Sequence, residues 1–135
     1  VLLSVLAVGL FFLWIFIQNE WEKRQRAAIK FTVNYDLEVC SQEYPLAIRI
    51  TNLSRRTIEK VAFGVQGHIS GYSDPLYETP YNTYTTDRII AKGDSWRSCW
   101  KIPARSYGAS ESRISSNPPA NLVWSVTGSY PTFQD

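Results

Sequence analysis

The chain begins with a continuous apolar run, from Val1 to Ile17, that contains no charged residue. About 17 residues of helix at about 1.5 Å each reach about 26 Å, the short end of what a bilayer core requires. Because the sequence contains no methionine, we expect residues ahead of Val1 to complete the span. The run therefore predicts a transmembrane helix over residues 1–19, continued by a helical juxtamembrane stalk over residues 20–29.

The residues after this run distinguish an anchor from a cleaved signal peptide. A signal peptide has a shorter apolar region that ends at a small-x-small cleavage site, whereas here the polar, charged segment Gln18–Arg26 follows directly. Trp14 and Trp21 lie one heptad apart near the exit, where aromatic rings favour the membrane interface. We therefore predict an uncleaved single-pass anchor, with Trp14 and Trp21 in contact with interfacial lipid.

Two signals conflict over which side of the membrane holds the rest of the chain. Four basic residues follow the span, which by the positive-inside rule favours the cytoplasm; they are Lys23, Arg24, Arg26 and Lys30. Cys40 and Cys99 are the only cysteines, and an isolated pair without metal-ligand spacing indicates one disulfide in an oxidising compartment. We favour the cysteines, because residues ahead of Val1 can carry the deciding charges. A bacterial inner membrane with a periplasmic domain is the expectation.

From Lys30 onward the apolar residues recur every second position, which is the period of a half-buried strand. The first alternating set comprises Phe31, Val33, Tyr35, Leu37 and Val39. Further strands are predicted over residues 46–51, 58–69, 96–102 and 122–130, with a weak edge strand over residues 81–86. Short alternating strands between Gly, Pro and Asn turns predict a mainly β, antiparallel immunoglobulin-like β-sandwich over residues 30–135.

Odd and even positions along a strand face opposite sides of the sheet, so the parity of the apolar residues predicts which face each occupies. Ile58 is out of phase with Val61, which predicts a bulge near Glu59 and Lys60. Trp96, Trp100 and Ile102 share the core face of one strand; Leu122, Trp124, Val126 and Tyr130 share one face of the last strand. Two long loops, over residues 66–86 and 103–121, separate these strands, and neither shows helical periodicity.

The segment LAIRITNLSRRTIEKV, residues 46–61, and the later Lys-Gly-Asp-Ser at residues 92–95 resemble small immunoglobulin-like domains of membrane-anchored bacterial proteins. FxLYD-type domains are an example, in which one strand ends at Asn-x-Ser before the next begins. The Phe-x-Leu-Tyr-Asp signature itself is absent here. The resemblance implies an immunoglobulin-like fold that acts in binding or assembly rather than catalysis.

The cysteines are interpreted as a structural bridge. Cys40 and Cys99 share the parity of their polar neighbours, so a disulfide between them would lie on an outer face or edge of the sandwich. A redox role requires a low-pKa thiol, usually from a Cys-x-x-Cys motif or a flanking base, and the sequence contains neither. We therefore predict a stabilising disulfide.

The loop over residues 66–86 contains four tyrosines within a short, Gly-, Ser- and Thr-rich stretch: Tyr72, Tyr77, Tyr81 and Tyr84. Rigid amphipathic rings among small polar residues are typical of protein-binding surfaces. The alternative is that some tyrosines fold back onto the core and bond to the backbone. The sequence leaves both interpretations open.

The remaining residues include few groups that suit catalysis or metal binding. His68 is the only histidine, and no motif singles out a serine nucleophile for it. Asp74 and Glu78 are an acidic pair on a loop, whose spacing defines no glycosidase geometry. Basic and acidic residues balance outside residues 20–30, so no nucleic-acid partner is expected. We expect no enzyme, metal or cofactor, and no small-molecule ligand.

Two functions follow from these features. The first is a membrane-anchored, non-catalytic accessory or assembly subunit, which contacts an integral membrane protein partner or complex and membrane lipid. The alternative is an extracytoplasmic module in which tryptophans and loop tyrosines stack on a glycan or cell-wall fragment. Trp96 and Trp100 lie on the predicted core face, which favours the first function.

Overall fold

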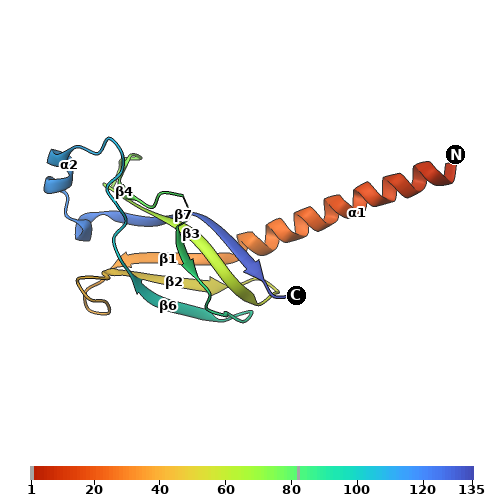
Figure 1. The fold of residues 1–135 in the computed structure, drawn as a ribbon, viewed down its shortest axis with the longest axis horizontal. Helices are drawn as coiled ribbons and strands as arrows, with labels where there is room; N and C mark the ends of the chain where they lie inside the picture. Colours follow the sequence, from red (N-terminus) through yellow and green to blue (C-terminus); the bar gives the residue numbers. More distant parts are fainter. Residues whose placement is uncertain (1, 82) are drawn as a thin grey trace.

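The computed structural model describes residues 2–81 and 83–135, and shows a β-sandwich preceded by one long helix (Figure 1). The elements in chain order are α1 (Leu2–Ala27), β1 (Ile29–Tyr35), β2 (Leu46–Asn52), β3 (Ile58–His68), β4 (Pro75–Glu78), β5 (Tyr84–Thr86), β6 (Ser95–Trp100), α2 (Glu111–Ser116), a 3₁₀ turn (Pro119–Asn121) and β7 (Val123–Phe133). The predicted fold class is confirmed.

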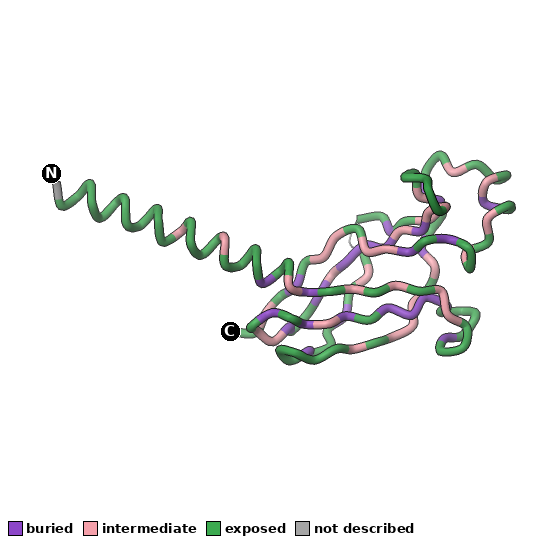
Figure 2. The backbone as a smooth tube through the Cα atoms, turned by 180° about the vertical axis from the view of Figure 1, so that it is seen from behind, coloured by how far each residue is buried: buried purple, intermediate pink, exposed green. Residues whose placement is uncertain are grey.

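Helix α1 projects away from the sandwich with its apolar side chains exposed along its length (Figure 2). An 18-residue window within its segment Leu3–Ala27 has a mean hydropathy of 1.7, and the segment is long and apolar enough to cross a membrane. The helix continues through residues 20–27 of the predicted stalk and ends at Ala27. The sandwich begins one residue earlier than predicted, because Ile29 is buried and pairs with Asn52 of β2.

The two antiparallel sheets have different strand orders. In the first, β2 lies between β1 and β6; in the second, β3 lies between β7 on one side and the short strands β4 and β5 on the other. Strand β1 continues directly from α1, so its far end, near Tyr35, is the end of the domain distant from the helix (Figure 1). We call this the distal end.

The core lies where the inner faces of the sheets meet. Its fully buried members include Leu46, Ile48, Ile50, Ile58, Val61, Phe63, Val65 and Leu76. The ring of Phe63 is central, with its centroid 5.4 Å from both Phe31 and Trp100 and 5.9 Å from Tyr84. The core thus joins aromatic rings from three strands besides β3.

The first predicted strand extended too far. Strand β1 ends at Tyr35, and Leu37 and Val39 are exposed in a turn instead of lying on a sheet face. The Asp36 side chain accepts hydrogen bonds from the backbone N–H groups of Glu38 and Val39. An aspartate that bonds its own following backbone favours a turn over a strand, and this local bond overrides the alternating pattern.

Two bulges set the parity of the paired strands β3 and β7. The bulge predicted near Glu59 and Lys60 is confirmed by a register shift between Ile58 and Lys60. A second shift, in which Gly64 pairs with Gly128 but Val65 pairs with Val126, leaves Thr127 as an extra residue. It reverses the later parity, so Pro131 is buried and Tyr130 is 58% exposed. The predicted inward position of Tyr130 is therefore wrong.

The loop over residues 103–121 contains a short helix that the sequence pattern did not predict. Helix α2 begins after Ser110, whose side chain accepts a hydrogen bond from the Arg113 N–H, and buries only Ile114. A helix of this length has too few apolar positions for a period to be recognised.

Candidate functional site

The junction between α1 and the sandwich is held by specific contacts. Gln25 is the one buried polar residue of α1 and accepts a hydrogen bond from the Arg55 backbone N–H at 2.7 Å. Ala28 accepts a second bond, from the Leu53 backbone N–H at 3.0 Å. The loop after β2 therefore holds the last turn of the helix against the sandwich. We call this hydrogen-bonded connection between the end of α1 and the loop after β2 the braced joint.

Arg56 extends this joint. Its guanidinium lies 5.9 Å from the Trp21 ring centroid and 5.1 Å from that of Phe133, distances at which a cation is attracted to an aromatic face. It also donates a hydrogen bond to the Gln134 carbonyl at 3.0 Å. Trp14 is 58% exposed and Trp21 38%, so Trp21 packs partly against the domain in addition to its predicted interfacial role.

Replacing Gln25 by Ala should loosen the joint, because it leaves the Arg55 N–H without its partner. A lost bond of this kind costs about 1 kcal/mol. We expect a broader distribution of distances between spin labels placed on α1 and on β6, measured by pulsed electron paramagnetic resonance in nanodiscs. Gln18→Ala, an exposed position on the same helix, is the matched control. An unchanged distribution in Gln25→Ala would contradict the bracing role.

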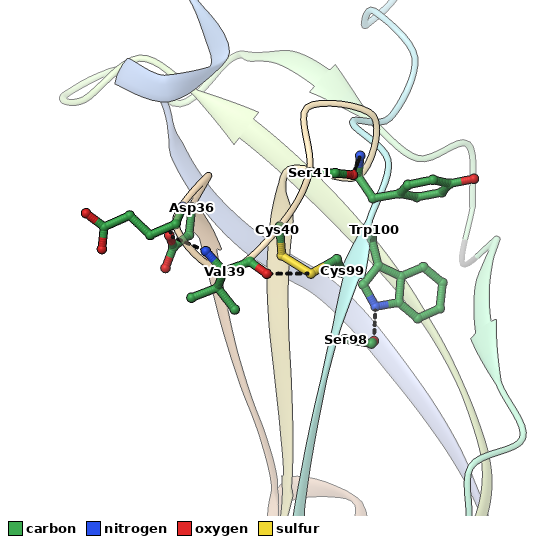
Figure 3. Close-up of a disulfide and its surroundings, with 9 residues drawn as sticks. Asp36, Val39, Cys40, Ser41, Ser98, Cys99 and Trp100 are labelled. Atoms are coloured by element: carbon green, nitrogen blue, oxygen red, sulfur yellow. Dashed lines mark hydrogen bonds between the residues drawn. A yellow bond between two sulfur atoms is a disulfide. The ribbon is translucent and has the colours of Figure 1, made fainter.

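The predicted disulfide is present between Cys40 and Cys99, with a Cα–Cα distance of 5.7 Å (Figure 3). Cys99 lies on β6 opposite Ala47 of β2, and Cys40 lies in the turn after β1. The bridge therefore stays at the distal end of one sheet and does not cross the core, as predicted. It holds the turn that exposes Leu37 and Val39.

The four tyrosines of the predicted site differ in burial and do not lie on one surface. Tyr77, on β4, is half-buried with its ring centroid 6.0 Å from that of Trp124. Tyr84, on β5, stacks on Trp100 at 5.2 Å and donates a hydrogen bond to the Lys101 carbonyl. These two tyrosines fold back onto the core, which is the alternative that the sequence left open.

Burial raises the pKa of Tyr84 from 10.0 to about 12. The unfolded chain then ionises at lower pH than the folded one, so this contribution to stability is complete below pH 10.0 and is lost as pH rises towards 12. We expect the free energy of unfolding in urea to fall over this window more steeply for the wild type than for Tyr84→Phe. Equal slopes, together with ordinary titration of all tyrosines at 295 nm, would contradict the assignment.

Tyr72 and Tyr81 remain exposed, at 62% and 93%. Tyr72 lies in the loop after β3, at the distal end, whereas Tyr81 lies between β4 and β5 and has a positive φ of 56°. The sequence did not single out Tyr107, which is fully exposed in the loop after β6. A lone tyrosine among serines gave no compositional signal comparable to the four clustered ones.

The two long loops meet at the distal end. Strand β4 exchanges backbone bonds with the loop after β6, from Glu78 N–H to the Ala104 carbonyl at 3.0 Å and from Ser106 N–H to the Leu76 carbonyl at 2.9 Å. A small recess of about 160 Å³ lies between them, lined in part by Asp74, Glu78 and Tyr107. Figure 1 shows α2, β4 and the disulfide-linked turn all at this end. We define the distal surface as three segments: the turn between β1 and β2, the loop after β3 together with β4, and the loop after β6 together with α2.

Of the candidate catalytic groups, Asp74 and Glu78 both line this recess. His68 ends β3 opposite Pro75. Within residues 2–81 and 83–135, no three His, Cys, Asp or Glu side chains form a group that could hold a metal ion. Trp96 and Trp100, the candidates for glycan stacking, pack against the core.

Compared with protein-family profiles, with curated proteins and with solved structures, the chain matches none.

Proposed function

We propose that this chain is a non-catalytic accessory subunit of a membrane protein complex, anchored by α1 and acting through protein contacts from the sandwich. The braced joint between α1 and the domain carries the proposal. A flexible linker lets a domain sample many orientations, whereas a stiff connection holds it in one orientation. Fixing the domain on its helix, by Gln25 and Arg56, suits contact with a partner that is itself held in the membrane.

The distal surface supplies a suitable contact region. It presents exposed Leu37, Val39, Tyr72 and Tyr107 on loops that the disulfide and the β4 hydrogen bonds hold in place. Fixed loops lose little conformational entropy on binding, and tyrosine supplies contact area with few rotatable bonds. These residues suit a protein partner better than a small ligand, because the recess beside them has a volume of only about 160 Å³ and a mainly polar lining.

The disulfide supports the predicted side of the membrane. Bonds between cysteines persist in oxidising compartments, and Cys40–Cys99 forms within the folded domain. We propose a bacterial inner membrane with the sandwich in the periplasm. Alkylation of intact cells and of permeabilised cells, followed by non-reducing electrophoresis, tests the oxidised state in place.

Gentle detergent extraction of the full-length protein, followed by mass spectrometry of the chains that travel with it, tests the function. A stoichiometric integral membrane protein is the expected companion. The double variant Tyr72→Ser, Tyr107→Ser should lower its recovery by about tenfold, the size of a moderate hot spot. Ile89→Ser, at a residue that is 58% exposed but lies away from the distal surface, is the control. A chain that runs alone in several mild detergents contradicts the proposal.

A further inference from the structure

Two strands expose unpaired backbone edges to the same side of the sandwich. Strand β1 pairs only with β2, and β7 pairs only with β3, among the strands of the described residues. The two strands lie against each other across the gap between the sheets but form no ladder. A row of free N–H and C=O groups is a template for another strand.

A groove of about 640 Å³ runs between these edges, lined by residues 29–34 of β1 and 124–129 of β7. On its inner side, Phe31, Val33 and Val126 are only partly buried although they pack against the core. The groove therefore contains both partly exposed apolar side chains and the unpaired backbone groups of β1 and β7. Lys30 is the only charged residue in its lining.

The strand order explains why this edge is free. The order β1–β2–β6 against β3–β7 corresponds to strands A–B–E against C–F of an immunoglobulin-like sandwich, in which a further strand, G, pairs with the outer edge of F. Strand β7 occupies the position of F. Among the described residues no strand occupies the position of G.

We propose that this groove binds an extended segment of the partner membrane protein, which adds as a strand to the free edge of β7. The inference rests on the proposed function and names its mode of contact. Such a segment would place alternate apolar side chains over Phe31, Val33 and Val126, while its backbone pairs with β7.

The course of the groove identifies the segment as juxtamembrane. The groove lining begins at Ile29, immediately after α1, and includes residues 29–34 of β1. Strand β1 runs away from the helix (Figure 1). A chain that leaves the membrane beside α1 enters the groove directly. It then runs parallel to β1 and antiparallel to β7, which runs from the distal end back towards the helix.

A second copy of this chain fits the groove poorly. Two β7 edges that pair antiparallel are related by a two-fold axis perpendicular to the strands. Because α1 leaves the domain broadly along the strand direction (Figure 1), that axis would send the two anchors in opposite directions. Two chains in one membrane leave their anchors on the same side.

The first test adds a strand to the free edge of β7 from within the same chain. An Asn-Gly turn and the strand Lys-Val-Thr-Val-Thr-Val-Glu are appended after Asp135, so that the hairpin folds back along β7 in the proposed direction. The control replaces the three appended valines by serine. We expect the valine version alone to raise Tm by about 5 °C, and to slow hydrogen exchange of outward β1 and β7 amides at least about tenfold. No change in either measurement overturns the proposal.

The second test expresses the valine-extended and the serine-extended proteins in native membranes. The valine extension should abolish co-purification of the partner, whereas the serine extension should leave it unchanged. A partner that co-purifies equally with both extensions overturns strand addition but leaves the accessory function standing. If no partner travels with the unmodified chain, the accessory function fails, while the exchange data still decide whether the groove accepts a strand. If the unmodified chain forms a homodimer and the valine extension dissociates it, a second copy occupies the groove, and the proposal of a partner segment is overturned.

Discussion

Removing the Cys40–Cys99 bridge should lower the free energy of unfolding of the sandwich by about 4 kcal/mol. The cysteines are 59 residues apart, and closing a loop of that length removes about this much chain entropy from the unfolded state. For a domain of this size the loss corresponds to a fall in Tm of about 15–20 °C. Urea unfolding of the double variant Cys40→Ala, Cys99→Ala, compared with the wild type, measures it.

The same variant separates the bridge from side effects of reduction. Adding a reductant should destabilise the wild type to the level of the double variant, and should leave the double variant itself unchanged. Hydrogen exchange should also accelerate first in residues 36–45, because the bridge ties this turn to β6. A loss of less than about 1 kcal/mol would show that the unfolded chain is already compact around this loop.

Asn52→Ala is expected to destabilise the domain by a similar amount, about 4 kcal/mol. The Asn52 side chain is fully buried, and its amide donates to the Arg56 carbonyl at 2.8 Å and to the Ile90 carbonyl at 2.9 Å. Its oxygen accepts from the Ser54 backbone N–H and hydroxyl. The substitution leaves several buried polar groups without this partner, and each costs about 1–3 kcal/mol.

Asn34→Ala, at an exposed position on β1, is the matched control and should change stability by less than about 0.5 kcal/mol. Because Asn52 organises the loop that holds Gln25, its loss should also loosen the joint with α1. Equal stability of the two variants would contradict the role of this network.

The interpretation of the four tyrosines shows where sequence reasoning stops. Composition alone grouped Tyr72, Tyr77, Tyr81 and Tyr84, but their burial depends on which way each residue of β4 and β5 faces. Strands as short as these have too few residues for an alternating pattern to fix their phase. Tyr77 and Tyr84 consequently turned out to belong to the aromatic core.

The sequence by itself determined the features that depend on local pattern: the apolar helix, the period-two strands, the bulge near Glu59 and the pairing of Cys40 with Cys99. Tertiary structure alone decided the features that depend on residues distant in the chain. Gln25 meets Arg55, and Trp21 meets Arg56, only because the loop after β2 returns to the helix. The free edges of β1 and β7 likewise face one groove only once the sheets are stacked, because an unpaired edge is a property of strand order and leaves no mark in either strand's own sequence.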